Sequence, residues 1–171
     1  AGASQAAGIV FSFGAGVTAE RQAAFQAAAN EIQQLIQFRH DIKVSVSFKA
    51  LSCSNSSAAL GFAGPDNINI NFSGAPQSNI WYVSAMAADY GHPAAMDDVS
   101  HITGEFNSNL GNAGCLSGTT WYYGADHNPG FNQVDFVATA VHEFMHGLGF
   151  ISFNDKNGAN ADNNGTSDSG H

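Results

Sequence analysis

The chain has 171 residues, of which 44% are hydrophobic, and this is enough for one domain with a substantial core. Its formal net charge is −9 with only five Lys and Arg residues, which argues against binding to nucleic acid or to anionic membrane surfaces. No stretch approaches the roughly 18 consecutive apolar residues of a membrane span.

The first fifty residues predict a strand, a helix and a second strand. Residues 8–13 form a short apolar run, and Thr18 is expected to cap a helix that extends to about Arg39. The inner face of this helix is expected to carry Phe25, Ala28, Ile32, Leu35 and Ile36. Residues 42–51 alternate between apolar and polar side chains, which predicts a half-exposed strand. This order of elements predicts a right-handed crossover between parallel strands.

The middle of the chain predicts three short strands and a long loop. Residues 68–72 and 100–107 alternate in polarity, and residues 80–83 form a short aromatic run. Residues 109–130 are rich in Gly, Asn and aromatic side chains, which predicts a structured loop. A loop directly ahead of a catalytic helix often shapes a substrate cleft.

The cysteine content and the polar composition indicate an extracellular protein. Cys53 and Cys115 are the only cysteines, and such a pair predicts one disulfide, with two buried free thiols as the alternative. Charged residues make up only 11% of the chain, which is typical of secreted proteins. The start at Ala1 is expected to be a mature terminus left after processing. We therefore expect secretion.

The stretch from His142 to Gly149 carries the residues that point to chemistry. His142 and His146 are four residues apart, so on a helix they share one face and can reach one metal ion. Two imidazoles in this arrangement suit Zn²⁺. Glu143 follows the first histidine and is expected to act as the general base beside the metal without ligating it.

The sequence around this motif predicts the helix that the ligand geometry needs. Apolar residues recur at helical spacing over residues 134–148, which predicts an amphipathic helix with one face against the core. Asn132 is the predicted N-cap. Gly147 and Gly149 predict the point where the helix ends.

The motif His142-Glu143-x-x-His146-x-x-Gly149 resembles the first eight positions of the metzincin metallopeptidase signature. In that signature the third zinc ligand follows the glycine by three positions, where this chain has Ser152, a poor zinc ligand. The stretch after His146 looks more like the leishmanolysin-like branch, in which an insertion displaces the third histidine. The chain is also similar to a group of secreted bacterial predicted metallopeptidases, through residues 121–124 and 133–136.

This resemblance implies an α/β fold of the α+β, zincin-like kind. The expected architecture is a twisted mixed sheet with a long N-terminal helix and an active-site helix, and a lower subdomain that is short or missing. Residues 1–153 would form the catalytic upper domain and residues 154–171 a polar tail. In such enzymes the strand ahead of the active-site helix forms the sheet edge that pairs with substrate. We assign this role to residues 102–107, with an ordinary edge strand as the alternative. The expected substrate-binding residues are Ile102, Gly104 and Phe106.

The polar tail offers several interpretations. It could supply the third zinc ligand, for which His171 is the best residue type and Asp155, Asp162 and Asp168 are alternatives; a ligand from outside the chain is a further one. Residues 160–171 also match part of an EF-hand-like loop, which makes Ca²⁺ a second candidate ion. In that match, His171 stands in place of the usual glutamate. A flexible polar tail is the simplest alternative.

The expected function is a secreted zinc-dependent endopeptidase that acts on protein or peptide substrates. Oxyanion donors, chosen by residue type alone, are Tyr122, Tyr123, His127 and His101. Metzincins carry a methionine-containing turn after the third ligand, and all three methionines here lie at or before the helix. The chain is therefore expected to be a natural truncation, a self-cleaved fragment or one half of a nicked enzyme, and a missing C-terminal fragment is a candidate partner. The alternatives are a non-catalytic secreted binding module with a structural metal, and a zinc amidase acting on non-peptide substrates.

Overall fold

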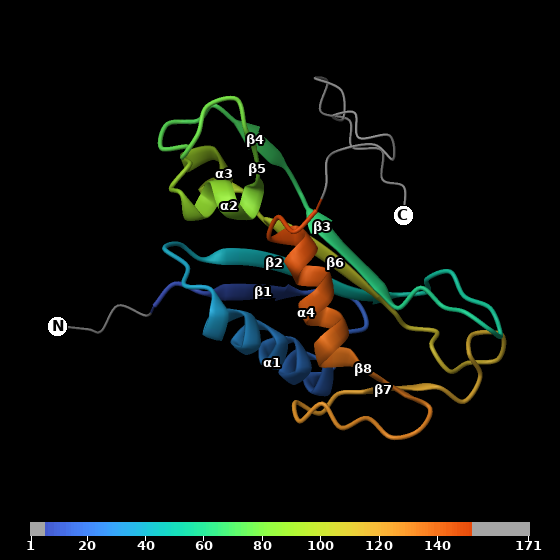
Figure 1. The fold of residues 1–171 in the computed structure, drawn as a ribbon. Helices are drawn as coiled ribbons and strands as arrows, with labels where there is room; N and C mark the ends of the chain where they lie inside the picture. Colours follow the sequence, from blue (N-terminus) through green and yellow to red (C-terminus); the bar gives the residue numbers. More distant parts are fainter. Residues whose placement is uncertain (1–5, 152–171) are drawn as a thin grey trace.

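A computed structural model describes residues 6–151 of the chain. The fold is mixed α/β, with a twisted mixed sheet and four helices in the described part (Figure 1). The sequence prediction of this fold class, with a long N-terminal helix and a helix over the His142 motif, is confirmed. No helix in residues 6–151 has the length and the apolar character to cross a membrane.

The N-terminal part consists of β1 (Ile9–Phe13), α1 (Ala19–Leu35) and β2 (Ile42–Lys49). β1 and β2 pair in parallel, as the order of elements predicts. Thr18 is the N-cap of α1, and its hydroxyl accepts a hydrogen bond from the backbone N–H of Arg21. α1 ends earlier than predicted, and Leu35 is 87% exposed, so its predicted place on the inner face is wrong.

The four-stranded sheet has the order β1-β2-β6-β3, where β3 is Gly61–Pro65 and β6 is Ile102–Asn107. β6 pairs in parallel with β2 and antiparallel with β3, so both of its backbone sides are occupied. The prediction that β6 forms the sheet edge is therefore wrong, and β3 is the edge strand on this side. Proline is compatible with an edge strand because no ladder partner requires its missing N–H, and Pro65 lies in β3.

The side chains predicted to bind substrate on β6 are inside the molecule. Ile102 and Phe106 have no exposed surface. Gly104 lies against the core as well, because a Cβ atom added there would be 3.5 Å from Phe144 and from Ala63. Since neither their side chains nor their backbone can reach an added strand, these three residues have a structural role.

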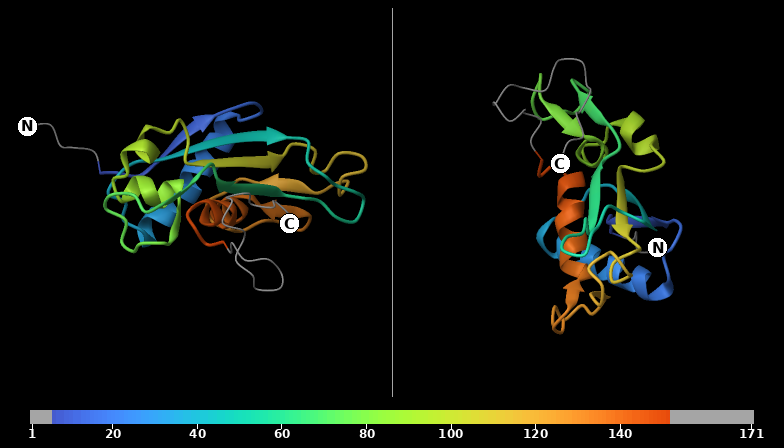
Figure 2. Two further views of the ribbon diagram at one scale, coloured as in Figure 1. Left: turned by 90° about the horizontal axis from the view of Figure 1, so that it is seen from above. Right: turned by 90° about the vertical axis from the view of Figure 1, so that its right-hand side faces the viewer.

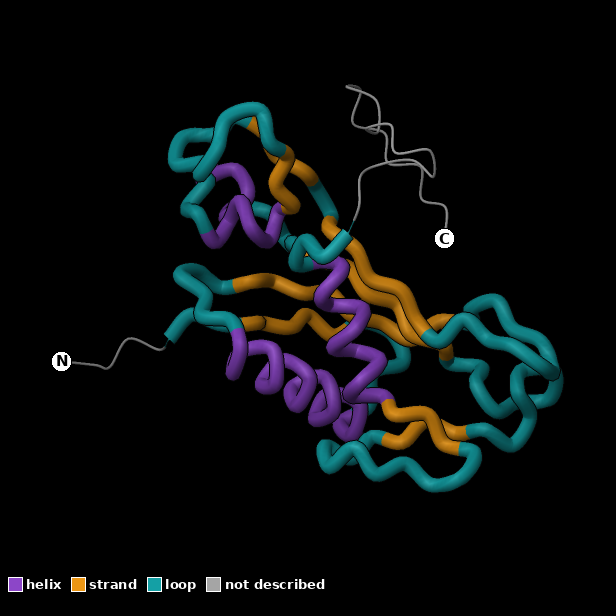
Figure 3. Tube along the Cα trace, viewed as in Figure 1, coloured by secondary structure: helices purple, strands orange, loops and turns teal. Residues whose placement is uncertain are grey.

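A small lobe is inserted between β3 and β6 (Figure 3). It contains β4 (Ile68–Ile70) paired antiparallel with β5 (Trp81–Val83), and the short helices α2 (Ser84–Asp89) and α3 (Pro93–Asp97). The lobe has a core of its own, which consists of Tyr82, Ala87, Ala88 and Ala95. It lies beside the end of the sheet at which α4 (Phe136–Gly147) terminates (Figure 1).

The helix α4 (Phe136–Gly147) carries the motif that the sequence singles out. It follows β7 (Thr120–Tyr122) and β8 (Gln133–Asp135), a parallel pair within and after the predicted long loop. Its N-cap is Asp135, whose Oδ1 accepts a hydrogen bond from the N–H of Ala138 at 2.9 Å. The prediction of Asn132 as the N-cap is wrong, because β8 intervenes before the helix begins. The predicted end at Gly147 is confirmed.

α1 and α4 pack against each other on one face of the sheet (Figure 2). This face carries Ile42, Val44, Val46 and Phe48. Phe25 of α1 lies at the centre of this core, with its ring centroid 5.0 Å from Phe136 and 5.2 Å from Phe106. α4 also approaches β6 very closely at Gly147. A Cβ atom there would be only 2.4 Å from Cγ2 of Ile102, so this position requires glycine.

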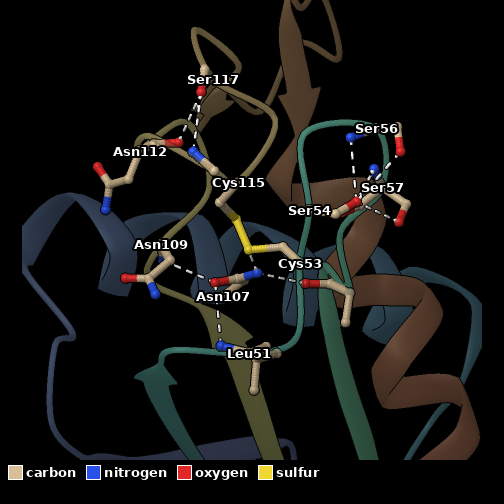
Figure 4. The surroundings of a disulfide bond; sticks show 12 residues. Leu51, Cys53, Ser54, Ser56, Ser57, Asn107, Asn109, Asn112, Cys115 and Ser117 are labelled. Atoms are coloured by element: carbon tan, nitrogen blue, oxygen red, sulfur yellow. Dashed lines mark hydrogen bonds between the residues drawn. A yellow bond between two sulfur atoms is a disulfide. The ribbon is translucent and has the colours of Figure 1, made fainter.

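The predicted disulfide between Cys53 and Cys115 is confirmed, with the two Cα atoms 5.1 Å apart (Figure 4). It joins the connection between β2 and β3 to the connection between β6 and β7. Beside it, the Asn107 side chain donates to the carbonyl of Ala59 and accepts from the N–H of Asn109, both at 2.8 Å. The disulfide and this amide together hold the two connections against each other.

Candidate metal centre

His142 and His146 lie one turn apart on α4, and their rings converge. Their Nε2 atoms are 3.1 Å apart, and the ring planes are perpendicular. Two nitrogen ligands at about 2.05 Å from a tetrahedral zinc ion would lie about 3.3 Å apart. The spacing of the two ring nitrogens therefore fits a shared zinc ion, without rearrangement of the helix.

The orientation of the His146 ring is fixed by a hydrogen bond at Nδ1, the ring nitrogen that does not face His142. Its Nδ1 lies 2.9 Å from the backbone carbonyl of Phe150. A carbonyl only accepts hydrogen bonds, so Nδ1 carries the proton and Nε2 presents its lone pair outward. Such a partner on the second ring nitrogen is the usual support for a metal-ligating histidine.

The local sequence explains how Phe150 reaches this ring. Gly149 has a φ of +110°, a backbone conformation that favours glycine, and it turns the chain back after α4. The N–H of Phe150 then donates to the carbonyl of Met145 at 3.0 Å. A Cβ atom at position 149 would also lie 2.9 Å from Sδ of Met86, so a larger residue would displace that side chain, but the backbone conformation is the main reason for glycine here. The turn at Gly149 thus positions the carbonyl of Phe150, which orients the His146 ring.

Glu143 is half-buried and directed toward the edge strand β3. Its Oε2 accepts a hydrogen bond from the backbone N–H of Ala63 at 3.1 Å. Burial raises the pKa of Glu143, while the Ala63 hydrogen bond and the nearby His142 and His146 oppose the rise. A carboxylate with a raised pKa beside two converging histidine rings is suited to accept a proton.

The register of β3 explains why the N–H of Ala63 is available to Glu143. The backbone N–H of Asn107 donates to the carbonyl of Leu60, and the backbone N–H of Asp66 donates to the carbonyl of His101. Both hydrogen bonds join residues that lie opposite each other when the β3–β6 register is extended by one residue at each end. In an antiparallel pair, alternate residues direct both backbone groups to the partner strand. The N–H and C=O of Ala63 therefore point away from β6, toward the free edge.

The described residues contain only part of a zinc ligand set. Among residues 6–151, no third His, Cys, Asp or Glu joins His142 and His146. Ser152 and every candidate for the third ligand, namely His171, Asp155, Asp162 and Asp168, lie outside the described residues. The segment proposed for Ca²⁺, residues 160–171, lies outside them as well.

The predicted oxyanion donors are engaged elsewhere. His101 is fully buried, where its Nδ1 accepts from the N–H of Lys43 and its Nε2 donates to the carbonyl of Ala95. Burial lowers the pKa of His101, so this ring is neutral. The hydroxyl of Tyr123 accepts from the Arg21 guanidinium, and that of Tyr122 donates to Asp126. His127 interacts with two carboxylates near the start of α4.

Two residues of the candidate site were not predicted from the sequence. Ala63 and Phe150 act through their backbone N–H and C=O, so their side chains carry no signal for these roles. The glycine at position 149 was the only local indication of the turn that brings the Phe150 carbonyl back.

An apolar pocket of about 240 Å³ lies beside the C-terminal end of α4. Phe150 and Leu148 line it together with Met86 and Tyr90 of the small lobe. Phe150 therefore lines this pocket while its carbonyl holds the His146 ring. A larger hollow of about 850 Å³ lies between β1 and the C-terminal end of α1, and its lining includes none of the residues of the His142 motif.

Comparison with known proteins adds no family to these observations. No protein-family model matches the chain, and no curated protein and no solved structure shows significant similarity to it.

Proposed function

We propose that this chain is a secreted, metzincin-like zinc endopeptidase. The observation that carries this proposal is the convergence of the His142 and His146 Nε2 atoms at 3.1 Å. The Phe150 carbonyl fixes one of these rings, and Glu143 lies beside the pair with its carboxylate oriented by Ala63. Two ligands and an oriented base within one turn of helix are the minimum that zinc-assisted hydrolysis requires.

In this proposal, His142 and His146 hold the zinc ion together with a third group. His171 remains the first candidate, because imidazole suits zinc and the resemblance implies a histidine downstream. Zinc bound there would supply Lewis acidity, which acidifies water and polarises a carbonyl group. The described part of the chain supplies the remaining chemistry through Glu143 and the edge strand.

Glu143 would accept the proton of the attacking water and later transfer it to the leaving amine. The N–H of Ala63 holds Oε2, which leaves Oε1 to take the proton. Burial of the carboxyl group brings its pKa closer to the working pH, and this favours proton transfer in both directions. The same hydrogen bond limits rotation of the carboxylate, so the base is oriented before the substrate arrives.

An extended substrate would add to the free edge of β3. Gly61, Ala63 and Pro65 direct their backbone groups outward, as judged from the register with β6. Pro65 has no N–H, and Glu143 occupies the N–H of Ala63. This edge of β3 thus offers three acceptors, but Gly61 alone offers a free donor.

The shortage of free N–H donors on the β3 edge leaves one carbonyl of a paired substrate without a hydrogen-bond partner. A substrate residue opposite Ala63 would donate its N–H to the Ala63 carbonyl, but its own carbonyl would find the Ala63 N–H already occupied. That carbonyl is left free beside Glu143 and the two histidines. We therefore assign it to the scissile peptide bond, and the register of β3 would position the bond that is cut.

The disulfide supports an extracellular setting. Cys53 and Cys115 are bonded, and such bonds persist in oxidising compartments. The low content of charged residues is consistent with secretion.

The test combines metal content with proteolysis. Zinc stoichiometry and casein hydrolysis should be measured for the wild type, His142→Ala, Glu143→Ala and the control Glu20→Ala, which changes an exposed carboxylate on α1. We expect His142→Ala to lose zinc and activity. Glu143→Ala should retain zinc and lose activity, while Glu20→Ala should retain both.

The same assay separates the alternatives. Bound zinc without hydrolysis of casein or of any cell-wall amide would support a binding module with a structural metal. Hydrolysis of peptidoglycan or chitin derivatives but not of casein would support a zinc amidase. Unchanged casein hydrolysis in Glu143→Ala would contradict the assignment of the base.

A further inference from the structure

His127 lies in the connection between β7 and β8 and contacts two carboxylates at once. Its Nδ1 is 2.6 Å from Oδ2 of Asp135, and its Nε2 is 2.8 Å from Oε1 of Glu31. Glu31 belongs to α1, whereas Asp135 is the residue that caps α4. A single imidazole thus joins the connection, the long N-terminal helix and the start of the helix that carries His142.

The chemistry of these contacts requires a charged ring. An ionised carboxylate only accepts hydrogen bonds, and a neutral imidazole has one donor. Both contacts are therefore satisfied only when Nδ1 and Nε2 each carry a proton. A neutral ring would direct a lone pair at one of the two carboxylates, which is repulsive.

Asp135 makes the contact relevant to α4. One of its carboxylate oxygens accepts the N–H of Ala138 in the first turn of the helix, and the other faces His127. The same carboxylate is therefore both the helix cap and the anchor of the imidazole. The hydroxyl of Thr139 donates to the Asp135 carbonyl at 2.7 Å, which further fixes this residue.

We propose that His127 is a proton-dependent latch, which adds a polar link between α1 and the N-terminal end of α4 while its ring is doubly protonated. The link is lost when the ring loses a proton, while the apolar packing of the two helices through Phe25 and Phe136 remains. The charged groups that face it are Glu31 from α1, Asp135 at the start of α4 and Asp126 in its own connection. All three are acidic, so they act together to retain the proton. Its backbone has a φ of +52°, an uncommon conformation for a non-glycine residue.

The direction of the pH effect follows from the same contacts. Hydrogen bonds to Asp135 and then to Glu31 raise the pKa of His127 above its ordinary value. A raised folded-state pKa means that the folded chain binds the proton more tightly than the unfolded chain. The stabilisation is therefore fully present below the unfolded histidine pKa of about 6.5, and it is lost as the pH rises through the folded-state value.

The first test is an NMR titration of the histidine ring protons in the wild type and in Glu31→Gln. We expect His127 to titrate above about 6.5 in the wild type and to move toward that value in Glu31→Gln. A wild-type midpoint at or below the ordinary value would overturn the proposal, as would an unchanged midpoint in Glu31→Gln.

The second test compares thermal unfolding of the wild type and His127→Asn at about pH 5 and about pH 9, on either side of the ordinary histidine pKa. Asparagine tolerates the left-handed backbone but cannot bridge both carboxylates. We expect the Tm of His127→Asn to lie below that of the wild type by about 2–4 °C at the lower pH, because both ion pairs are partly exposed, and this gap to close at the higher pH. His92→Asn is the control, since His92 stacks on Phe72 in the small lobe. A difference that is the same at both pH values would contradict the latch.

The two tests do not depend on each other or on zinc. If His127→Asn does not fold, the titration of the wild type and Glu31→Gln decides the matter. Neither measurement uses hydrolysis, so the latch stands or falls separately from the proposed function.

Discussion

Both edges of the four-stranded sheet have an outward backbone N–H that is covered by a side chain from a helix. At the β1 edge, Oε1 of Gln33 in α1 accepts from the N–H of Ile9 at 2.7 Å. At the β3 edge, Oε2 of Glu143 in α4 accepts from the N–H of Ala63 at 3.1 Å. The arrangement is the same, but the first group is a neutral amide and the second an ionisable carboxylate.

The two edges differ in the ionisation of the group that accepts the hydrogen bond. An amide satisfies the N–H of Ile9 without any cost of burying a charge. At the β3 edge, burial raises the pKa of Glu143, so the folded chain disfavours its ionised form. In the proposed function, this carboxylate at the β3 edge is the proton acceptor beside His142 and His146, whereas the amide at the β1 edge has no such role.

The largest expected effect comes from exchanging the two groups. Glu143→Gln keeps an acceptor for the Ala63 N–H but removes the proton acceptor, so hydrolysis should fall by about 10²–10⁴-fold. Gln33→Glu also keeps an acceptor at its edge and should leave hydrolysis unchanged. Measurement of kcat/KM for both variants tests the comparison directly. Equal losses in the two variants would show that the edges do not differ in function.

A smaller effect is expected when Gln33 no longer accepts the hydrogen bond from the N–H of Ile9 at the β1 edge. Gln33→Leu leaves the N–H of Ile9 without a partner in a half-buried site, which should lower the free energy of unfolding by about 1–3 kcal/mol. Chemical denaturation measures this loss, and kcat/KM reports whether the site is affected. A drop in kcat/KM with unchanged stability would contradict a purely structural role for this edge.

If substrate pairs with β3, the effect of backbone N-methylation on binding should alternate between successive positions of the peptide. In a series of peptides methylated at single backbone nitrogens, the position whose N–H faces the Ala63 carbonyl should bind about tenfold more weakly, because one hydrogen bond is lost. Its immediate neighbours point away from β3 and should be much less sensitive. A loss of similar size at every position would exclude strand pairing at this edge.

The smallest effect concerns stability and pH in the zinc-free chain. The folded-state pKa of Glu143 is raised, so between the unfolded and folded values the folded chain binds more protons, and stability falls as pH rises through this window. Glu143→Gln removes this loss and should be the more stable protein at neutral pH. The difference should shrink as the pH falls below the unfolded glutamate pKa of about 4.3. Urea denaturation at several pH values provides the measurement, and a constant difference would contradict it.

Sequence patterns predicted what depends on neighbours along the chain. The spacing of His142 and His146 required only that residues 134–148 be helical, and the apolar periodicity already indicated this. The Thr18 cap and the alternation of buried and exposed residues in β2 also depend only on residues nearby in the sequence. The cysteine pair was predictable because the chain offers only one pairing.

Strand order was not predictable in the same way, because it depends on contacts between distant segments. β3 has the sequence Gly-Phe-Ala-Gly-Pro, with no β-branched residue and two glycines, so no strand pattern was evident. β6 alternates clearly, but its alternation does not reveal that β3 covers its outer side. The cap of α4 was misplaced because Asp135 belongs to a strand whose partner, β7, is more than ten residues earlier.

The disulfide between Cys53 and Cys115 also determines the covalent connectivity of the molecule. The residues between the two cysteines include β3, the entire small lobe and β6. A protease that cut the connection between β4 and β5 would open the backbone there, but the N-terminal and C-terminal pieces would remain joined through the sulfur atoms. The edge strand would stay attached to the helix that carries Glu143, and the cut would become visible as two fragments only after reduction.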